Sequence, residues 1–156
     1  MSSDVGTRTA HRRHKLSRVQ RITPYLLYED VAGALDWLGR AFGFRERLRS
    51  EAPDGTVWHA EMELEDASVM LGDPGPDYRN PRSLGGSTIL VHVYVDDVDA
   101  HCERARAAGA VIHMEPTDEP YGDRRYDCED PEGHRWSFAQ RVRTVPPEEW
   151  GAIVSP

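Results

Sequence analysis

The sequence predicts an α+β fold in which two β-α-β-β-β modules form curved mixed sheets around a cup. Three observations support this prediction. The chain resembles itself at an offset of 67 residues, which aligns Asp30 with Asp97 and Gly55 with Gly122. Each repeat opens with a strand that runs into an acidic helix start, and each expected helix is followed by three short strands. An internal repeat of this kind indicates one structural unit used twice.

The first module is expected over residues 21–71. It opens with an apolar strand at 22–28, followed by Glu29 and Asp30, whose carboxylates can cap free backbone N–H groups at the positive end of a helix. The apolar face of that helix is made by side chains at helical spacing: Val31, Ala34, Leu35, Leu38 and Phe42. Gly43 stands where a left-handed residue ends a helix. Three strands follow, with a Pro-Asp-Gly turn among them.

The second module, at 88–140, repeats this order after a linker rich in Gly and Pro at 72–87. Its strand at 89–95 runs into a second acidic pair. The apolar side chains of the helix that follows are Val98, Cys102, Ala105 and Ala108. An Asp-Pro-Glu-Gly turn precedes the last strand. We expect residues 21–140 to form one domain, with a C-terminal extension at 141–156.

Residues alternate along a strand between its two faces, so each sheet should have an apolar face under its helix and a mixed face opposite. The apolar face of the first module is expected to carry Trp58, Ala60, Met62 and Leu64. Its mixed face is expected to carry His59, Glu61 and Glu63. In the second module His92 and Tyr94 should lie on the mixed face. Two curved sheets with such mixed faces can enclose a cup that suits a ligand.

Charge is distributed unevenly along the chain. Residues 1–20 hold five of the 19 basic residues and one of the 27 acidic residues, which leaves 14 basic and 26 acidic residues, a formal charge of −12, for the rest. A domain with this negative charge repels nucleic acid and anionic membranes. The basic segment at 1–20 is expected to be a disordered tail. No apolar run approaches the roughly 18 residues that span a bilayer, and the N-terminus lacks a signal-peptide core. We therefore expect a cytoplasmic protein without a nucleic-acid or membrane partner.

Several separate segments agree, in the same order, with one known family. Val-Asp-Asp-Val at 95–98 and Asp-Pro-Glu-Gly-His at 130–134 resemble the vicinal oxygen chelate superfamily of glyoxalases, bleomycin-resistance proteins and extradiol dioxygenases. The segments at 59–61 and 121–124 look most like its bleomycin-resistance or PhnB-like branch. The resemblance covers about residues 21–140 and implies paired modules around a cup. This fold hosts many chemistries, so the site rather than the fold decides the function.

The resemblance also implies four metal-ligand positions, two in each module. Metal-dependent members hold His, Gln or Glu there, whereas these positions fall here on Thr23, Met70, Leu90 and Ser137. The repeat relates them in pairs at the same offset. Neutral hydroxyls are weak ligands, a thioether suits soft metals, and leucine has no donor atom. We therefore expect neither a metal at these positions nor another cofactor.

A displaced metal site stays open as an alternative. His59, Glu61 and His92 all belong to mixed faces, and two histidines with a carboxylate are a familiar set for iron or zinc. Such a site would support a metal-dependent glyoxalase-like lyase or isomerase, or a dioxygenase. Acid–base catalysis without a metal, by Glu61 or His92, is a third alternative.

The favoured hypothesis is a metal-independent binding protein of the bleomycin-resistance type, which sequesters or carries an antibiotic or metabolite and for which no catalytic residue is assigned. The resemblance implies a cleft completed between subunits, so a homodimer is expected. Aromatic rings could stack on the small organic ligand, while acidic and basic groups pair with its charges. The candidate ligand-binding residues are Tyr25, His59, Glu61, His92, Tyr94, Tyr121, Arg124 and Arg135.

Overall fold

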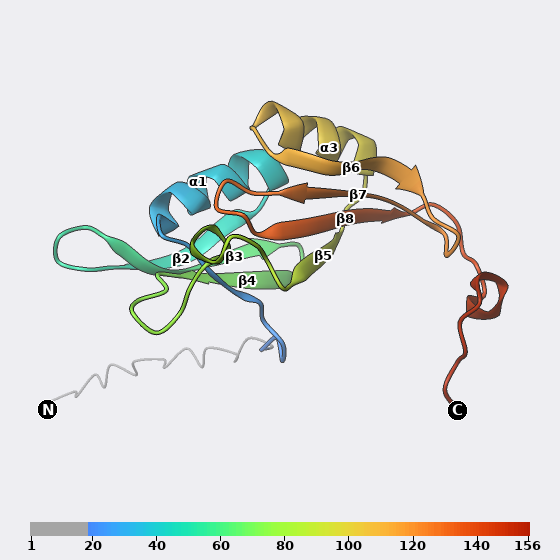
Figure 1. Cartoon of the computed structure of the whole chain (residues 1–156), viewed down its shortest axis with the longest axis horizontal. Helices are drawn as coiled ribbons and strands as arrows, with labels where there is room; N and C mark the ends of the chain where they lie inside the picture. The colour runs from blue at the N-terminus through green and yellow to red at the C-terminus, as the bar shows by residue number, and fades with distance from the viewer. Residues whose placement is uncertain (1–18) are drawn as a thin grey trace, which may run out of the picture.

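The computed structural model describes residues 19–156, and the fold predicted from the repeat is confirmed (Figure 1). Two four-stranded mixed sheets have the equivalent strand orders β1-β4-β3-β2 and β5-β8-β7-β6. The first sheet contains β1 (Tyr25–Leu27), β2 (Arg45–Glu51), β3 (Val57–Leu64) and β4 (Ala67–Gly72). The second contains β5 (Leu90–Tyr94), β6 (Val111–Asp118), β7 (Asp123–Glu129) and β8 (Arg135–Arg141). The tail predicted at 1–20 lies, except for its last two residues, outside the described part of the chain.

Both long helices begin as predicted. The side chain of Asp30 caps α1 (Val31–Phe42) by accepting a backbone N–H of the first turn at 2.9 Å. Asp97 caps α3 (Val98–Ala107) in the same way at 3.1 Å. Gly43 ends α1 in the left-handed conformation that glycine adopts without strain, with φ 81°. The acidic pairs therefore act as local start signals for the helices.

Other details depart from the sequence pattern or add to it. β1 is shorter than the strand predicted at 22–28, and Pro24, just before it, has no N–H to donate to a sheet. The linker contains the short helix α2 (Pro81–Leu84), and the C-terminal segment contains the 3₁₀ helix η1 (Pro147–Trp150). Among residues 19–156, no helix has the length and apolar character that crossing a membrane requires.

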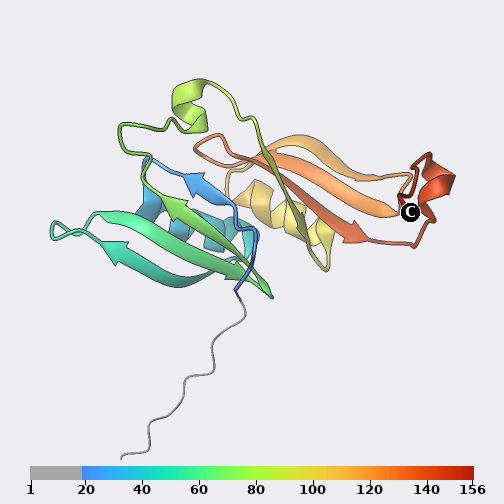
Figure 2. The same cartoon turned by 90° about the horizontal axis from the view of Figure 1, so that it is seen from below.

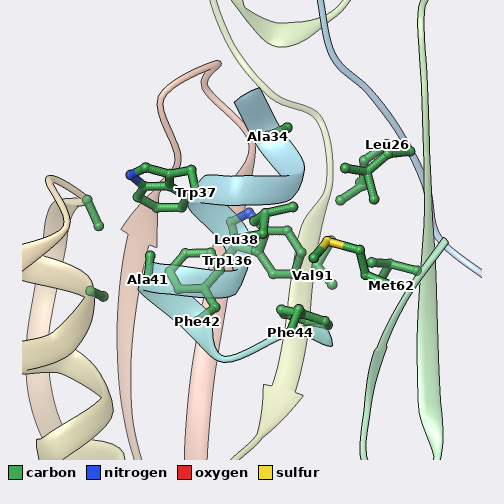
Figure 3. Packing of buried hydrophobic residues seen from close by; sticks show 14 of the residues in the cluster. Leu26, Ala34, Trp37, Leu38, Ala41, Phe42, Phe44, Met62, Val91 and Trp136 are labelled. Carbon is green, nitrogen blue, oxygen red and sulfur yellow. The ribbon is translucent and has the colours of Figure 1, made fainter. Parts of the chain in front are cut away.

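One hydrophobic cluster joins the two modules. Phe42, at the end of α1, lies against Trp136 of β8, with ring centroids 5.2 Å apart, and Phe44 lies 5.7 Å from the same indole (Figure 3). Trp37 of α1 donates its indole N–H to the carbonyl oxygen of Ala108, just after α3, at 2.8 Å. Because large aromatic side chains bury much apolar surface, the modules are held together by this common core as well as by the linker.

The two sheets lie side by side, with α1 and α3 packed together behind them in the view of Figure 2. Each helix covers one face of its own sheet. The opposite faces, called the open faces below, are both turned toward the viewer in Figure 2. One chain therefore presents two open sheet faces next to each other.

A buried polar network at the turn between β7 and β8 also connects the modules. The Glu132 carboxylate accepts the backbone N–H groups of Glu29 at 2.6 Å and Asp30 at 3.1 Å, just before α1. Asp130, in the same turn, accepts the Tyr28 hydroxyl at 2.6 Å. Buried carboxylates are tolerated when donors of this kind surround them. The Asp-Pro-Glu-Gly-His turn of the second module therefore positions the start of the first module's helix.

His101 of α3 links the two helices and should make the fold sensitive to acid. Its Nε2 donates to the Phe42 carbonyl oxygen at 3.1 Å, and its Nδ1 accepts the Tyr126 hydroxyl at 2.6 Å. Burial lowers the pKa of His101, and the charge of Arg104 acts in the same direction, while the bond to Phe42 opposes them. As the pH falls, His101 therefore becomes protonated in the unfolded chain before it does so in the folded protein. The free energy of unfolding should accordingly decrease as the pH falls below about 6.5.

Urea unfolding at about pH 7.5 and about pH 5.5 measures this effect. The wild-type protein should lose more stability between the two pH values than His101→Gln, which has no imidazole at this position to titrate. All other histidines are present in both proteins, so their contributions cancel in the comparison. An equal loss of stability in the two proteins would contradict the assignment.

Candidate ligand-binding site

The open face of the first sheet contains a cavity of about 570 Å³. Its lining comes from β2, β3, β4 and the segment before β1, and includes Thr23, Arg47, Glu61, Glu63, Ser68 and Met70. Small-molecule sites are commonly concave regions of about 300–1,000 Å³. The volume and the polar lining are therefore compatible with a small organic ligand.

Three charged groups in this cavity, Arg47, Glu61 and Glu63, lie close to one another. Arg47 forms an ion pair with Glu61 and approaches Glu63 to 3.9 Å. Arg45 reaches Glu63 from the solvent side at 3.2 Å. The Arg47 side chain is 51% exposed, whereas those of Glu61 and Glu63 are 16% and 28% exposed, so a charged ligand can reach the guanidinium from solvent. The cavity can therefore offer either a carboxylate or a guanidinium to a ligand.

Tyr25 and His59 meet beside this cavity. The Tyr25 hydroxyl lies 2.7 Å from His59 Nδ1, and His59 Nε2 lies 3.9 Å from the Glu61 carboxylate. Tyr25 stands on β1 and the other two on β3, with β4 between the two strands. The Tyr25 ring passes over Gly72 of β4, where a Cβ atom would lie only 2.5 Å from the ring. Glycine at this position thus permits the contact between Tyr25 and His59.

The open face of the second sheet carries a different polar set. His92 Nδ1 lies 3.2 Å from the hydroxyl of Ser137, which is fully buried. The Tyr94 hydroxyl donates to buried Asp123 at 2.7 Å, and the rings of His92 and Tyr94 meet edge to face. Arg135, at the start of β8, has a buried Nε atom with no hydrogen-bond partner among the described residues. This face thus offers aromatic edges and a guanidinium.

The candidate residues therefore fall into three groups. Tyr25, His59 and Glu61 come together on the first sheet, and His92, Tyr94 and Arg135 belong to the second. Arg124 pairs with Asp99 of α3 at 3.0 Å and with Asp118 at 3.2 Å, on the helix side of the sheet. Tyr121 packs against Trp150 of η1, with ring centroids 5.8 Å apart. The last two residues lie apart from the others.

Two further residues of the first sheet were missed by sequence reasoning. Arg47 holds Glu61, and the signal for it was available: Arg45 and Arg47 alternate along β2, the neighbour of β3 in the hairpin. Trp58 was expected in the core beneath the helix, and this was wrong, because 52% of its surface is exposed. It shares a strand face with buried Ala60 and lies near the start of β3. Its ring centroid is 5.9 Å from that of His59.

Comparison with known proteins identifies the family. A model of the Glyoxalase/Bleomycin resistance protein/Dioxygenase superfamily matches residues 18–138. The chain belongs to this superfamily. The match spans both modules and ends within β8, so the C-terminal segment with η1 lies outside it.

Proteins similar to this chain come from Mycobacterium, Micromonospora and Streptomyces. Proteins of Mycobacterium bovis and Mycobacterium tuberculosis H37Rv are 38% identical to this chain over 139 residues, which cover 86% of it and 91% and 82% of the relatives. The crystal structure of TioX from Micromonospora sp. ML1 is similar, with 39% identity and a TM-score of 0.65 over 80% of this chain and 100% of TioX. TnmS3, an antibiotic binding protein from Streptomyces sp. CB03234, matches with 23% identity and a TM-score of 0.62 over 82% of this chain and 98% of TnmS3.

The residues at the four superfamily metal positions do not fit a metal ion. Thr23 and Met70 line the cavity of the first sheet, but a neutral hydroxyl and a thioether are poor ligands for hard or borderline metals. Leu90 has no donor atom, and the Ser137 hydroxyl is buried beside His92. Within residues 19–156, no three His, Cys, Asp or Glu side chains gather as a metal site would require. In this described part of the chain, His59, Glu61 and His92 do not gather as the displaced site would require.

Proposed function

We propose that this protein binds a small organic molecule on its open sheet faces without a metal ion, and thereby sequesters or carries an antibiotic or metabolite. The observation that carries the proposal is a cavity of about 570 Å³ on the first sheet, which Thr23 and Met70 line in place of metal ligands. A superfamily member that keeps the concave face and lacks the ligands is suited to binding. TnmS3 shares the fold, and its antibiotic binding supports the capacity of the fold rather than the identity of the ligand.

The binding site is proposed to be completed by a second copy of the chain. Each chain presents two open faces side by side, and exposed apolar rings and side chains stand on them: Tyr25, Leu90 and Tyr94 are 48%, 48% and 52% exposed. Pairing the first sheet of one chain with the second sheet of its partner would cover these residues and enclose a cup. Light scattering should then give a particle of about twice 17.6 kDa, and a particle of 17.6 kDa would contradict the dimer.

Ligand binding can be measured by the tryptophan emission and the melting temperature of the protein. We expect a compound from a panel of aromatic and peptidic antibiotics to change at least one of them. Arg47→Ala should weaken binding by about tenfold, a typical loss for one charged contact. The matched control is Arg40→Ala, because Arg40 pairs with Asp36 on the exposed side of α1.

Two results would contradict the binding proposal. The first is a broad panel in which no compound changes the emission or the melting temperature of the protein. The second is a stoichiometric transition metal in the purified protein that is lost in a His59→Ala, His92→Ala double variant. That result would favour a metal-dependent enzyme.

A further inference from the structure

The contact between Tyr25 and His59 joins a hydroxyl to a ring nitrogen that can accept its proton, an arrangement that ligand binding alone does not require. We propose that Tyr25, His59 and Glu61 form a general-base site, at which the Tyr25 oxygen removes a proton from a weakly acidic organic molecule. Tyr25 would touch the substrate, and His59 and Glu61 would act through it. This inference concerns a chemical step and does not depend on the sequestration of an antibiotic.

The three groups are held in order along the open face. The Tyr25 hydroxyl lies 2.7 Å from His59 Nδ1, and the opposite ring nitrogen of His59 lies 3.9 Å from Glu61. His59 and Glu61 are two residues apart on β3, so both project to the same side. Their side chains are 18% and 16% exposed, whereas Tyr25 as a whole is 48% exposed. Tyr25 is thus the most accessible member of the array.

The backbone is adapted to this contact at Gly72. A Cβ atom there would lie 2.5 Å from the Tyr25 ring and 2.7 Å from its hydroxyl oxygen, closer than any side chain allows. Gly72 stands opposite His59 in the register of β3 and β4, and Met70 stands opposite Tyr25 in that of β1 and β4. The tyrosine therefore reaches diagonally across β4 to the histidine. Gly72→Ala should push the ring away and break the hydrogen bond.

Charges around His59 set the direction of proton transfer. The Glu61 carboxylate favours a proton on the near ring nitrogen, Nε2, which leaves the Nδ1 lone pair for the Tyr25 hydroxyl. Arg47 of β2 pairs with Glu61, while β4 contributes the uncharged Gly72 and Met70. Burial raises the pKa of Tyr25, so the hydroxyl keeps its proton until His59 accepts it.

The proposed step balances in protons and electrons. The acidic group of the bound molecule gives its proton to the Tyr25 oxygen as the hydroxyl proton passes to His59 Nδ1. The products are the conjugate base of the molecule and an imidazolium whose charge faces the Glu61 carboxylate. After the product leaves, the imidazolium returns its proton to solvent through Tyr25. Glu61 also lines the cavity of the first sheet, so a molecule bound there lies next to the array.

The elimination reaction of 5-nitrobenzisoxazole tests this site without knowledge of the natural substrate. A base removes the ring C–H proton, the electrons of that bond form a nitrile, and the N–O bond breaks to release a coloured phenolate. The protein should accelerate this reaction, and Tyr25→Phe and His59→Gln should each reduce the rate at least tenfold, since general bases contribute about 10²–10⁴-fold. His113→Gln is the matched control, because His113 pairs with Glu129 at 2.7 Å on the second module.

The pH dependence and NMR separate a chemical role from a structural one. The pH profile of the wild-type rate should differ from that of the residual rate of His59→Gln, which has no imidazole at this position. The ¹⁵N spectrum should show His59 protonated at Nε2, with an Nδ1 signal that moves in Tyr25→Phe. Equal rates in wild type and Tyr25→Phe, or a proton on Nδ1 at neutral pH, would overturn the proposal.

Discussion

Asp130→Ala is expected to lower the free energy of unfolding by about 3–5 kcal/mol, since each buried donor left without a partner costs about 1–3 kcal/mol. One carboxylate oxygen of Asp130 accepts the Tyr28 hydroxyl at 2.6 Å and the Trp136 indole N–H at 3.1 Å. The other accepts the backbone N–H groups of Glu132 and His134, both at 3.0 Å. Alanine would leave these four donors buried without their acceptor, and Tyr28 belongs to the other module. The loss should therefore loosen the contact between the modules.

Urea unfolding of Tyr28→Phe and Asp118→Ala gives two stability changes with which the loss in Asp130→Ala can be compared. Tyr28→Phe removes one donor and leaves Asp130 its other partners, so it should cost about 1.5–3 kcal/mol, the usual value for a hydrogen bond to a charged group. Burial and the Asp130 charge raise the pKa of Tyr28, so its hydroxyl stays a donor at neutral pH. The Asp118 side chain is 68% exposed, and its removal should change stability by less than about 0.5 kcal/mol. An Asp130→Ala protein as stable as Asp118→Ala would contradict the assigned role.

Trp136→Ala is expected to cost about 3–5 kcal/mol, as large-to-small substitutions of buried aromatic residues do. Its side chain is fully buried and lies against Phe42 and Phe44 of the first module and Phe138 of its own strand. Alanine would leave a cavity at the point where the aromatic side chains of both modules meet (Figure 3). It would also remove one of the donors to Asp130. Both consequences fall on the contact between modules.

Thermal and urea unfolding followed by circular dichroism measure this loss. Trp136→Phe keeps most of the packing and should cost clearly less than alanine. The matched control is Trp150→Ala, because Trp150 is 43% exposed and lies outside the main core. If Trp136→Ala and Trp150→Ala had equal effects, the common core would not be what holds the modules together.

The modules could be predicted because their signals are local. Asp30 and Asp97 cap helices through N–H groups within three residues, and Gly43 ends a helix by its own left-handed conformation. Strand alternation also assigned His59 and Glu61 to the open face, because a strand has only two faces. These features need no knowledge of distant parts of the chain. They account for the fold class and for the presence of His59 and Glu61 in the candidate site on the first sheet.

The remaining features of the site depend on contacts between distant segments. Strand alternation places Arg124 on one of the two faces of its strand but does not give its partner. The tertiary fold brings Asp99 of α3 beside Arg124. Strand alternation places Trp58 on the same face as the core residue Ala60, yet 52% of Trp58 is exposed, because alternation gives the face of a side chain and not how far that face is covered. Tyr25 reaches His59 because β4 lies between their strands and carries Gly72 at the crossing point.

The sequence by itself thus determined two repeated modules, their capped helices and the faces on which the polar side chains stand. Each of these follows from periodicity and from hydrogen bonds between near neighbours. The tertiary structure alone decided that the sheets lie side by side with open faces, that Tyr25, His59 and Glu61 form one array, and that Asp130 and Glu132 join the modules. Those outcomes depend on which distant surfaces pack together, because parity sets the direction of a side chain but not its distance to a partner.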